Sequence, residues 1–146
     1  HMNVAYYVLA FDFATDAFLD YIGLDHGYKA KAEVTTFVGD MNVTYVREVV
    51  EGAPLRFTTQ LLEYDSKKFR YFHSMYHAEE GFLAATCEWM NLHFDTRIRR
   101  VAPWPDEIRA RIAEFADNQG PQPWPEQAGQ RMHVKQPIFS GKPKPS

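Results

Sequence analysis

Three of the six histidines are the residues whose type first suggests a metal site: His73, His77 and His93. His73 and His77 are four residues apart in a segment of strand-like alternation, so they share one face of the predicted strand. Four residues of strand span roughly 13 Å, which is too far for both imidazoles to bind one ion. We therefore expect polar members of a sheet and no metal site.

Other reactive side chains have simple structural explanations. Asp12, Asp16 and Asp20 recur every fourth residue in a segment of helical periodicity, which predicts a solvated helix edge, and no second element offers convergent ligands. Cys87 lies in an apolar predicted strand, where packing explains it better than nucleophilic catalysis does. Glu88 is a weak candidate for a catalytic carboxylate, and a cross-strand partner explains it equally well.

The composition is that of a single globular domain. The 146 residues suffice to bury a core, 45% are apolar and 15% are aromatic. Net charge is −3 with acids and bases interspersed, so we expect neither a nucleic-acid partner nor, with such short apolar runs, a membrane span. No secretory signal is visible, and the one cysteine cannot form an internal disulfide, which predicts a cytoplasmic protein.

The first element is predicted to be a long, unusually apolar helix. Apolar residues recur at helical spacing from Val4 to Ile22, and Gly23 is a natural stop. The three aspartates form its only consistently polar stripe. A helix this apolar must be wrapped by another element, and a sheet is the element we expect.

After residue 30 the apolar period changes to two, which predicts strands at 32–38, 41–50, 54–64, 68–78 and 82–95. Short turn segments separate these strands, so consecutive strands should pair antiparallel as a meander. A helix that precedes a meander, instead of alternating with its strands, indicates the α+β class.

A short helix is predicted from Pro105 to about Asp117, with Pro105 in its first turn. Residues 119–146 are rich in Pro, Gln, Gly and Lys, which predicts an extended tail after a domain of residues 1–118. Part of this tail is expected to dock on the body or on a partner subunit.

The order and spacing of several segments resemble the hot-dog fold acyl-CoA thioesterases, in which a long helix is wrapped by an antiparallel sheet. The similar segments cover nearly the whole chain, and the betainyl-CoA thioesterase subgroup associated with carnitine breakdown is the most similar. They are His1 to Asn3 with Tyr7, 41–49 with Gly52, 68–77, 83–88, 92–95, 103–108 and 128–131.

One departure from the family's pattern affects the expected site. The family helix opens with D-x-x-G-H-x-N, and this sequence carries only the second half, at His1 and Asn3. The aspartate, the glycine and the preceding strand would fall before residue 1. Either His1-Met2 is a cloning remnant on a late start, or the sequence begins inside the motif. On both interpretations the first strand is missing, and we expect this chain to hydrolyse thioesters weakly or not at all.

The resemblance implies a catalytic site at the start of the helix. Amides of the first helical residues would polarise the thioester carbonyl, and Asn3 would either cap the helix or also orient a water. Asp40 is the candidate general base or nucleophile in place of the motif aspartate, because relatives often carry a carboxylate near this position. The alternative is that Gly39 and Asp40 form a turn between strands.

The expected substrate-binding residues are His1, Tyr7, Tyr45 and Trp89. His1 and Tyr7 match the family motif, whereas Tyr45 and Trp89 belong to the aromatic surplus of the chain. Such rings either fill the core and a subunit interface or, in part, form a cage for the quaternary ammonium of a betainyl group.

The sequence therefore predicts hydrolysis of a small acyl-CoA thioester, with betainyl-CoA as a candidate substrate and without metal or organic cofactor. The alternative is a non-catalytic hot-dog subunit or fragment that binds an acyl-CoA or a partner protein. A homodimer or homotetramer is expected, because the meander leaves exposed edges and the family pairs sheets across a dimer.

Overall fold

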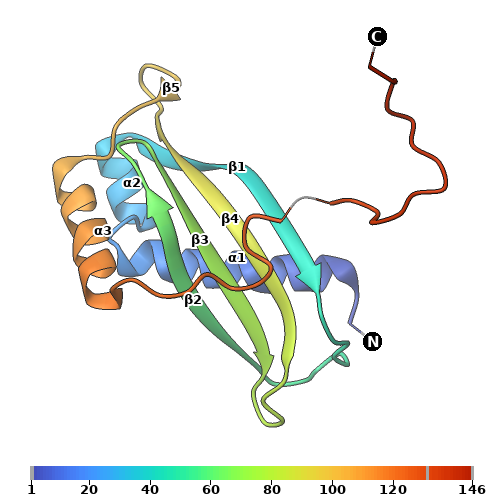
Figure 1. Ribbon diagram of the computed structural model, residues 1–146. Coiled ribbons are helices and arrows are strands. Elements are labelled where there is room, and N and C mark those ends of the chain that lie inside the picture. The colour runs from blue at the N-terminus through green and yellow to red at the C-terminus, as the bar shows by residue number, and fades with distance from the viewer. Residues whose placement is uncertain (1, 131, 146) are drawn as a thin grey trace.

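A long helix lies across one face of a twisted antiparallel sheet (Figure 1). The computed structural model describes residues 2–130 and 132–145. Its elements follow the order α1 (Val4–Tyr21), α2 (His26–Ala32), β1 (Val34–Tyr45), β2 (Leu55–Tyr64), β3 (Lys68–His77), β4 (Leu83–Asp95), β5 (Arg100–Val101) and α3 (Asp106–Gln119). The predicted α+β class, the long first helix and the short C-terminal helix are confirmed.

The strand order of the sheet differs from the expected meander. Strands β2, β3 and β4 pair consecutively, but β1 pairs with β4, giving the order β1-β4-β3-β2 with β5 alongside β4. Residues 46–54 must therefore cross from one edge of the sheet to the other, about 14 Å across three strand spacings. The prediction that every pair of consecutive strands would be neighbours was wrong for β1 and β2, because nine residues reach far enough to make this crossing.

Strand β1 is continuous where two strands were predicted. Its pairing with β4 shifts register between Val38 and Asp40, so Gly39 forms a β-bulge. The bulge inserts one residue and reverses the alternation of faces, which imitates a break between two strands. The alternative that Gly39 and Asp40 form a turn between strands was therefore wrong.

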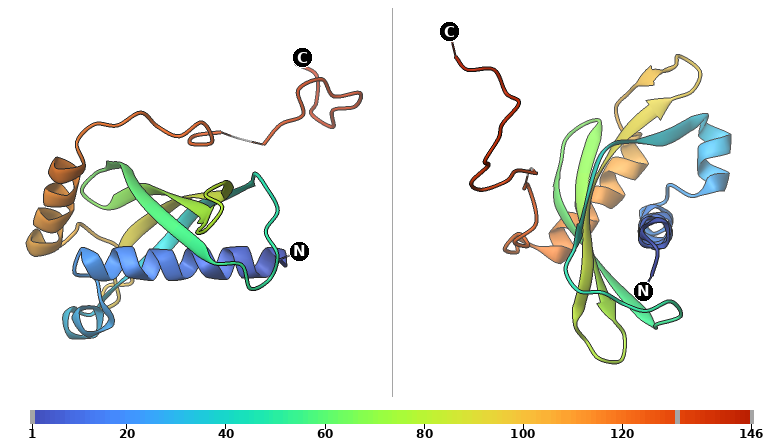
Figure 2. Two further views of the ribbon diagram at one scale, coloured as in Figure 1. Left: turned by 90° about the horizontal axis from the view of Figure 1, so that it is seen from below. Right: turned by 90° about the vertical axis from the view of Figure 1, so that its right-hand side faces the viewer.

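The core lies between α1 and the face of the sheet that it covers, which we call the inner face (Figure 2). Phe11 and Phe18 of α1 pack there against aromatic side chains of the sheet. The opposite, outer face carries the alternate side chains, which include Arg70 and Glu88. Buried members of the core cluster include Tyr7, Phe11, Phe18, Leu19, Leu61, Phe69, Tyr71, Met75, Cys87, Trp89, Trp104, Ile108 and Ile112.

The segment after α3 crosses the outer face of the sheet (Figure 2). We call residues 120–130 the strap. Gln60 of β2 donates to the Pro123 carbonyl, Trp124 lies 5.0 Å from the Arg70 guanidinium of β3, and Glu88 of β4 accepts from the Gly129 amide. Asn42 of β1 then donates to the Gln130 carbonyl at 3.4 Å. The strap thus contacts all four main strands in their spatial order.

None of the helices within the described residues combines the length and the apolar character that a bilayer crossing would require.

Candidate active site

The N-terminus of α1 presents backbone amides at the surface, as the sequence predicts. The Asn3 side chain caps the helix by accepting a hydrogen bond from the Ala5 amide at 2.9 Å, and the Asn3 carbonyl accepts from the Tyr6 amide at 3.0 Å. Among the described residues no hydrogen-bond partner of the Val4 amide is found. This first turn can therefore donate to a carbonyl oxygen that gains negative charge.

Residues 46–54, which connect the sheet edges, pass directly beside this helix end. The Val49 carbonyl accepts from the Met2 amide at 2.9 Å, and the Val49 amide donates to the Tyr7 hydroxyl at 3.3 Å. Both backbone groups of Val49 are thus held by the start of α1. Glu48, the residue before Val49, is exposed.

Tyr7 and Tyr45 meet edge to face next to the helix end. Their ring centroids are 5.0 Å apart at an interplanar angle of 88°. Tyr7 is buried, whereas Tyr45 is 48% exposed at the end of β1. Burial, followed by the influence of Tyr7 and Cys87, raises the pKa of Tyr45 above its ordinary value, so its hydroxyl stays protonated at neutral pH. The structure therefore brings Asn3, Tyr7 and Tyr45 together.

Trp89 lies deeper on the inner face. It is buried in β4 opposite Met41, and its ring centroid is 6.4 Å from that of His73. The strand partner of Tyr45 is Ala85, four residues from Trp89, which separates the two aromatic positions by roughly 13 Å along the strand. Within one chain, Tyr45 and Trp89 do not face each other across a single small cage.

Asp40 lies on the other side of the sheet from the helix end. It pairs with Met90, and its carboxylate, exposed to solvent, accepts from the adjacent Met41 amide at 2.9 Å. The expectation that this carboxylate would lie against a buried helix end is not met within one chain. The reason is the Gly39 bulge, after which even-numbered residues of β1 point outward.

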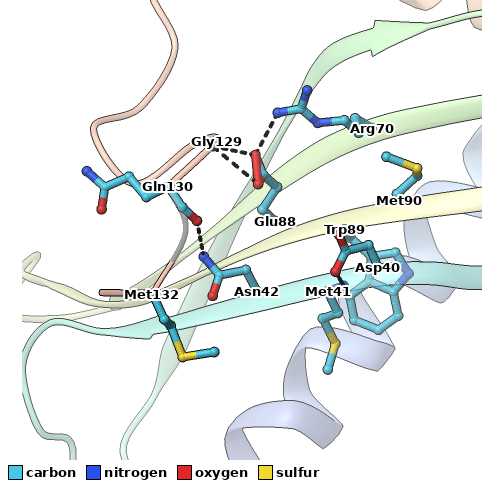
Figure 3. Close-up of a pocket in the computed structure, with 10 residues that line it drawn as sticks. All are labelled: Asp40, Met41, Asn42, Arg70, Glu88, Trp89, Met90, Gly129, Gln130 and Met132. Atoms are coloured by element: carbon cyan, nitrogen blue, oxygen red, sulfur yellow. Dashed lines mark hydrogen bonds and ion pairs between the residues drawn. The ribbon is translucent and has the colours of Figure 1, made fainter. Parts of the chain in front are cut away.

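The outer face has a hollow of about 570 Å³ between the sheet and the strap (Figure 3). Glu88 is its central side chain, because it accepts from the Gly129 amide at 2.7 Å and from the Arg70 guanidinium at 2.8 Å. These contacts make Glu88 an anchor for the strap, so the cross-strand explanation of this residue is correct and incomplete. Asp40, Asn42, Met90 and Gln130 also line the hollow.

The remaining predicted residues lie apart from the helix end. Burial raises the pKa of Cys87 to about 12, so its thiol is protonated and suited to packing. Nowhere in residues 2–130 and 132–145 do three or more His, Cys, Asp or Glu side chains form a group that could hold a metal ion. His1, expected to bind substrate, lies outside the described residues.

The sequence did not predict that the backbone of Val49 bonds to Met2 and Tyr7, because every residue carries the same backbone groups whatever its type. The segment 46–54 was assigned mostly to a strand that would have continued to residue 50. Tyr7 was selected from the sequence, but its hydroxyl contact was not, since it joins residues 42 positions apart.

Comparison with known proteins agrees with this geometry. The family model of the thioesterase-like superfamily matches residues 1–112. A betainyl-CoA thioesterase of Pseudomonas aeruginosa is 34% identical over 129 residues, which cover 88% of this chain and 81% of that protein. The chain belongs to the thioesterase-like superfamily. The predicted hot-dog fold is thereby confirmed, with a sheet that stays open at both edges.

This thioesterase-family chain is also similar to part of a longer protein and to a protein of known structure. An L-carnitine dehydrogenase/betainyl-CoA thioesterase of Agrobacterium fabrum is 35% identical over 88% of the chain, which spans only 26% of that longer protein. A Staphylococcus aureus protein, solved in complex with CoA, superposes with a TM-score of 0.87 at 28% sequence identity. The superposition covers 92% of this chain and 84% of the staphylococcal one.

Proposed function

We propose that this chain hydrolyses the thioester of a small acyl-CoA, with betainyl-CoA as the preferred substrate. The observation that carries the proposal is the 34% identity to the Pseudomonas betainyl-CoA thioesterase over most of both chains. The CoA complex of the staphylococcal structural relative supports the same ligand class. The names of the relatives favour hydrolysis over the alternative of a non-catalytic binding subunit. The L-carnitine dehydrogenase part of the longer relatives' names supports a role in carnitine breakdown.

The start of α1 would supply the electrophilic part of the site. Its first-turn amides would donate to the thioester oxygen as the tetrahedral intermediate forms, which lowers the barrier because the donors are already fixed by the Asn3 cap. Hydrolysis at such a site needs water and no metal or organic cofactor.

The half-exposed ring of Tyr45 is suited to the acyl group. A trimethylammonium head placed over this ring would gain cation–π attraction, and the edge-to-face contact with Tyr7 holds the ring in place. This contact would favour betainyl-CoA over an uncharged acyl-CoA of similar size.

A carboxylate must still activate the water. Asp40 remains the predicted base, and its position on the outer face of edge strand β1 means that it would serve a helix end only in an assembly with a second chain. Glu48 is added as the carboxylate that directly precedes Val49 at the helix end. We further propose a homodimer of the cytoplasm, joined along β1, because this strand is an open edge with exposed Phe37, Val38 and Met41.

The test is release of free CoA thiol from betainyl-CoA, acetyl-CoA and a long-chain acyl-CoA. We expect betainyl-CoA to have the highest kcat/KM, by roughly fivefold over acetyl-CoA, since a cation–π contact contributes on the order of 1 kcal/mol. Tyr45→Leu should abolish that preference, whereas Tyr64→Leu, at an exposed tyrosine of β2, should retain it. No turnover of any ester, with binding of CoA retained in calorimetry, would instead favour the binding subunit.

The same assay identifies the base. Of Asp40→Asn and Glu48→Gln, the variant that removes the base should lower kcat on the order of a hundredfold, with Glu51→Gln as the exposed control. Full activity in both variants would exclude both carboxylates while leaving the thioesterase proposal intact.

A further inference from the structure

The chain beyond the strap forms an extended arm with exposed apolar side chains. We call residues 132–145 the arm. Met132, Val134, Ile138 and Phe139 are between 73% and 106% exposed. The arm also carries Lys135, Lys142 and Lys144 and no acidic residue. A segment this apolar, held away from the body (Figure 1), is suited to binding a surface that is apolar and acidic.

Helix α1 has such a surface on the side that faces away from the sheet. Tyr6, Leu9, Phe13, Asp16 and Asp20 follow one another at spacings of three and four residues, and all are exposed. We call these five residues the α1 ridge. Asp12 flanks the ridge, and α1 contains no basic residue. Among the described residues none of the three aspartates has an ion-pair partner.

The arm and the ridge match in order and in length. The ridge rises over about 21 Å, with its apolar side chains first and its aspartates last. Residues 138–144 span about 20 Å when extended, with Ile138 and Phe139 first and Lys142 and Lys144 last. A parallel alignment therefore sets the apolar residues of the two segments against each other, and Lys142 and Lys144 against Asp16 and Asp20.

The two surfaces lie on opposite sides of the same chain. The strap holds the arm's start to the outer face through Asn42 of β1, whereas α1 covers the inner face (Figure 2). An intramolecular contact would need the arm to turn around the β1 edge. A second copy can offer its ridge without that turn.

We infer that the arm of one chain binds along the α1 ridge of a second copy. This contact holds subunits together by apolar burial and by charge pairing that is lost in high salt. It is separate from the proposed chemistry, which uses the start of α1 and the segment 46–54.

Disulfide trapping with two variants, each of which gains one surface cysteine, tests the contact. Ser140→Cys places a thiol in the arm about 7 Å past Ile138, and Ala10→Cys places one beside the ridge about 6 Å past Tyr6, so the two thiols meet in the parallel alignment. The native Cys87 is buried. A mixture of the two full-length variants, one labelled with ¹⁵N, should give a mixed disulfide dimer under mild oxidation. Ser140→Cys with Glu79→Cys, in the exposed β3–β4 turn, is the matched control and should give at least tenfold less.

Charge reversal supplies a second, independent test of the contact. Lys142→Glu with Lys144→Glu should reduce the mixed disulfide at least fivefold, and Asp16→Lys with Asp20→Lys on the partner should restore it. Salt of about 1 M, where the screening length is about 3 Å, should reduce trapping of the unreversed pair. Equal trapping by the Glu79→Cys control would overturn the inference. So would a disulfide found only within one chain carrying both Ser140→Cys and Ala10→Cys.

Discussion

His73 is a buried, neutral link between α1 and the sheet. Its Nε2 is 2.9 Å from Thr15 Oγ1 of α1 and its Nδ1 is 2.8 Å from Thr59 Oγ1 of β2. The Tyr71 hydroxyl donates to Asn91 Oδ1 and lies 3.5 Å from Thr15 Oγ1, which extends the network to β4. Two hydroxyl groups can satisfy a neutral imidazole by one donated and one accepted bond. A proton on His73 would leave this buried charge without a carboxylate partner.

The stability of the protein should therefore fall in acid. Burial lowers the pKa of His73 from its ordinary 6.5 to about 4. Between pH 6.5 and pH 4, this histidine therefore binds a proton in the unfolded chain but not in the folded chain. The part of the stability that depends on neutral His73 is fully present above about pH 6.5 and is lost as the pH falls towards 4. This residue should remove about 3 kcal/mol of the free energy of unfolding over that range, measured by urea titration.

Two controls isolate His73. His73→Gln should flatten the pH dependence, whereas His26→Gln, at an exposed histidine of α2, should leave it unchanged. If His73→Gln does not fold, the imidazole resonances of the unsubstituted protein can be followed by NMR. Protonation of His73 above pH 6 in the folded state would contradict the prediction.

Prediction at this scale succeeded where a residue acts through its own backbone neighbours. The Asn3 cap depends on residues two positions away, and Cys87 follows from the apolar strand around it. Placement of Asp40 failed because one bulge residue decides which face every later side chain of β1 occupies. The separation of Tyr45 from Trp89 depends on the pairing of β1 with β4, which the sequence pattern did not predict.

Among the elements, the open edge of β2 is blocked by the last residue of α3. The Gln119 side chain accepts from the Leu61 amide at 2.8 Å and donates to the Leu61 carbonyl at 2.9 Å. One amide group thereby imitates the paired hydrogen bonds of a neighbouring strand. The clamp also fixes where the strap begins its path across the outer face.

Removal of this clamp should loosen the β2 edge. Gln119→Ala should lower the free energy of unfolding by about 1–2 kcal/mol and speed hydrogen exchange of the Leu61 amide, because two half-buried backbone groups lose their partner. Gln122→Ala, which removes a side chain that donates to the Gln119 carbonyl at the surface, is the control. Exchange of the Leu61 amide that is unchanged in Gln119→Ala would show that α3 does not hold this edge.

The longer elements could be predicted because each has a sustained apolar period. The expected strands 54–64, 68–78 and 82–95 agree with β2, β3 and β4 within one or two residues. Helix α2 was missed because seven residues carry too little periodicity, although the Asp25 cap that accepts from the Tyr28 amide was a usable signal. Strand β5 has two residues and forms only through tertiary pairing with β4.

For the molecule as a whole, the β1 edge is the surface on which the proposed dimer depends. Light scattering of the unsubstituted protein at micromolar concentration should give at least twice the 17.0 kDa of one chain. Val38→Lys with Met41→Lys should shift the population towards monomer, because charged side chains on an edge oppose pairing with another strand. Ile98→Lys, in an exposed turn, should leave the mass unchanged. A monomeric mass for the unsubstituted protein would contradict the proposed dimer.

The Gly39 bulge also bears on how the length of this chain can vary. Before the bulge, odd-numbered residues such as Phe37 face outward; after it, even-numbered residues such as Asp40 and Asn42 do. A chain that lacked residue 39 would show the same side chains to the same faces, because Val38 and Asp40 would then alternate as ordinary strand neighbours. Deletion of Gly39 should therefore leave both the core packing and the contact of Asn42 with the strap unchanged. Deletion of Met41 instead would move each later side chain of β1 to the opposite face of the sheet.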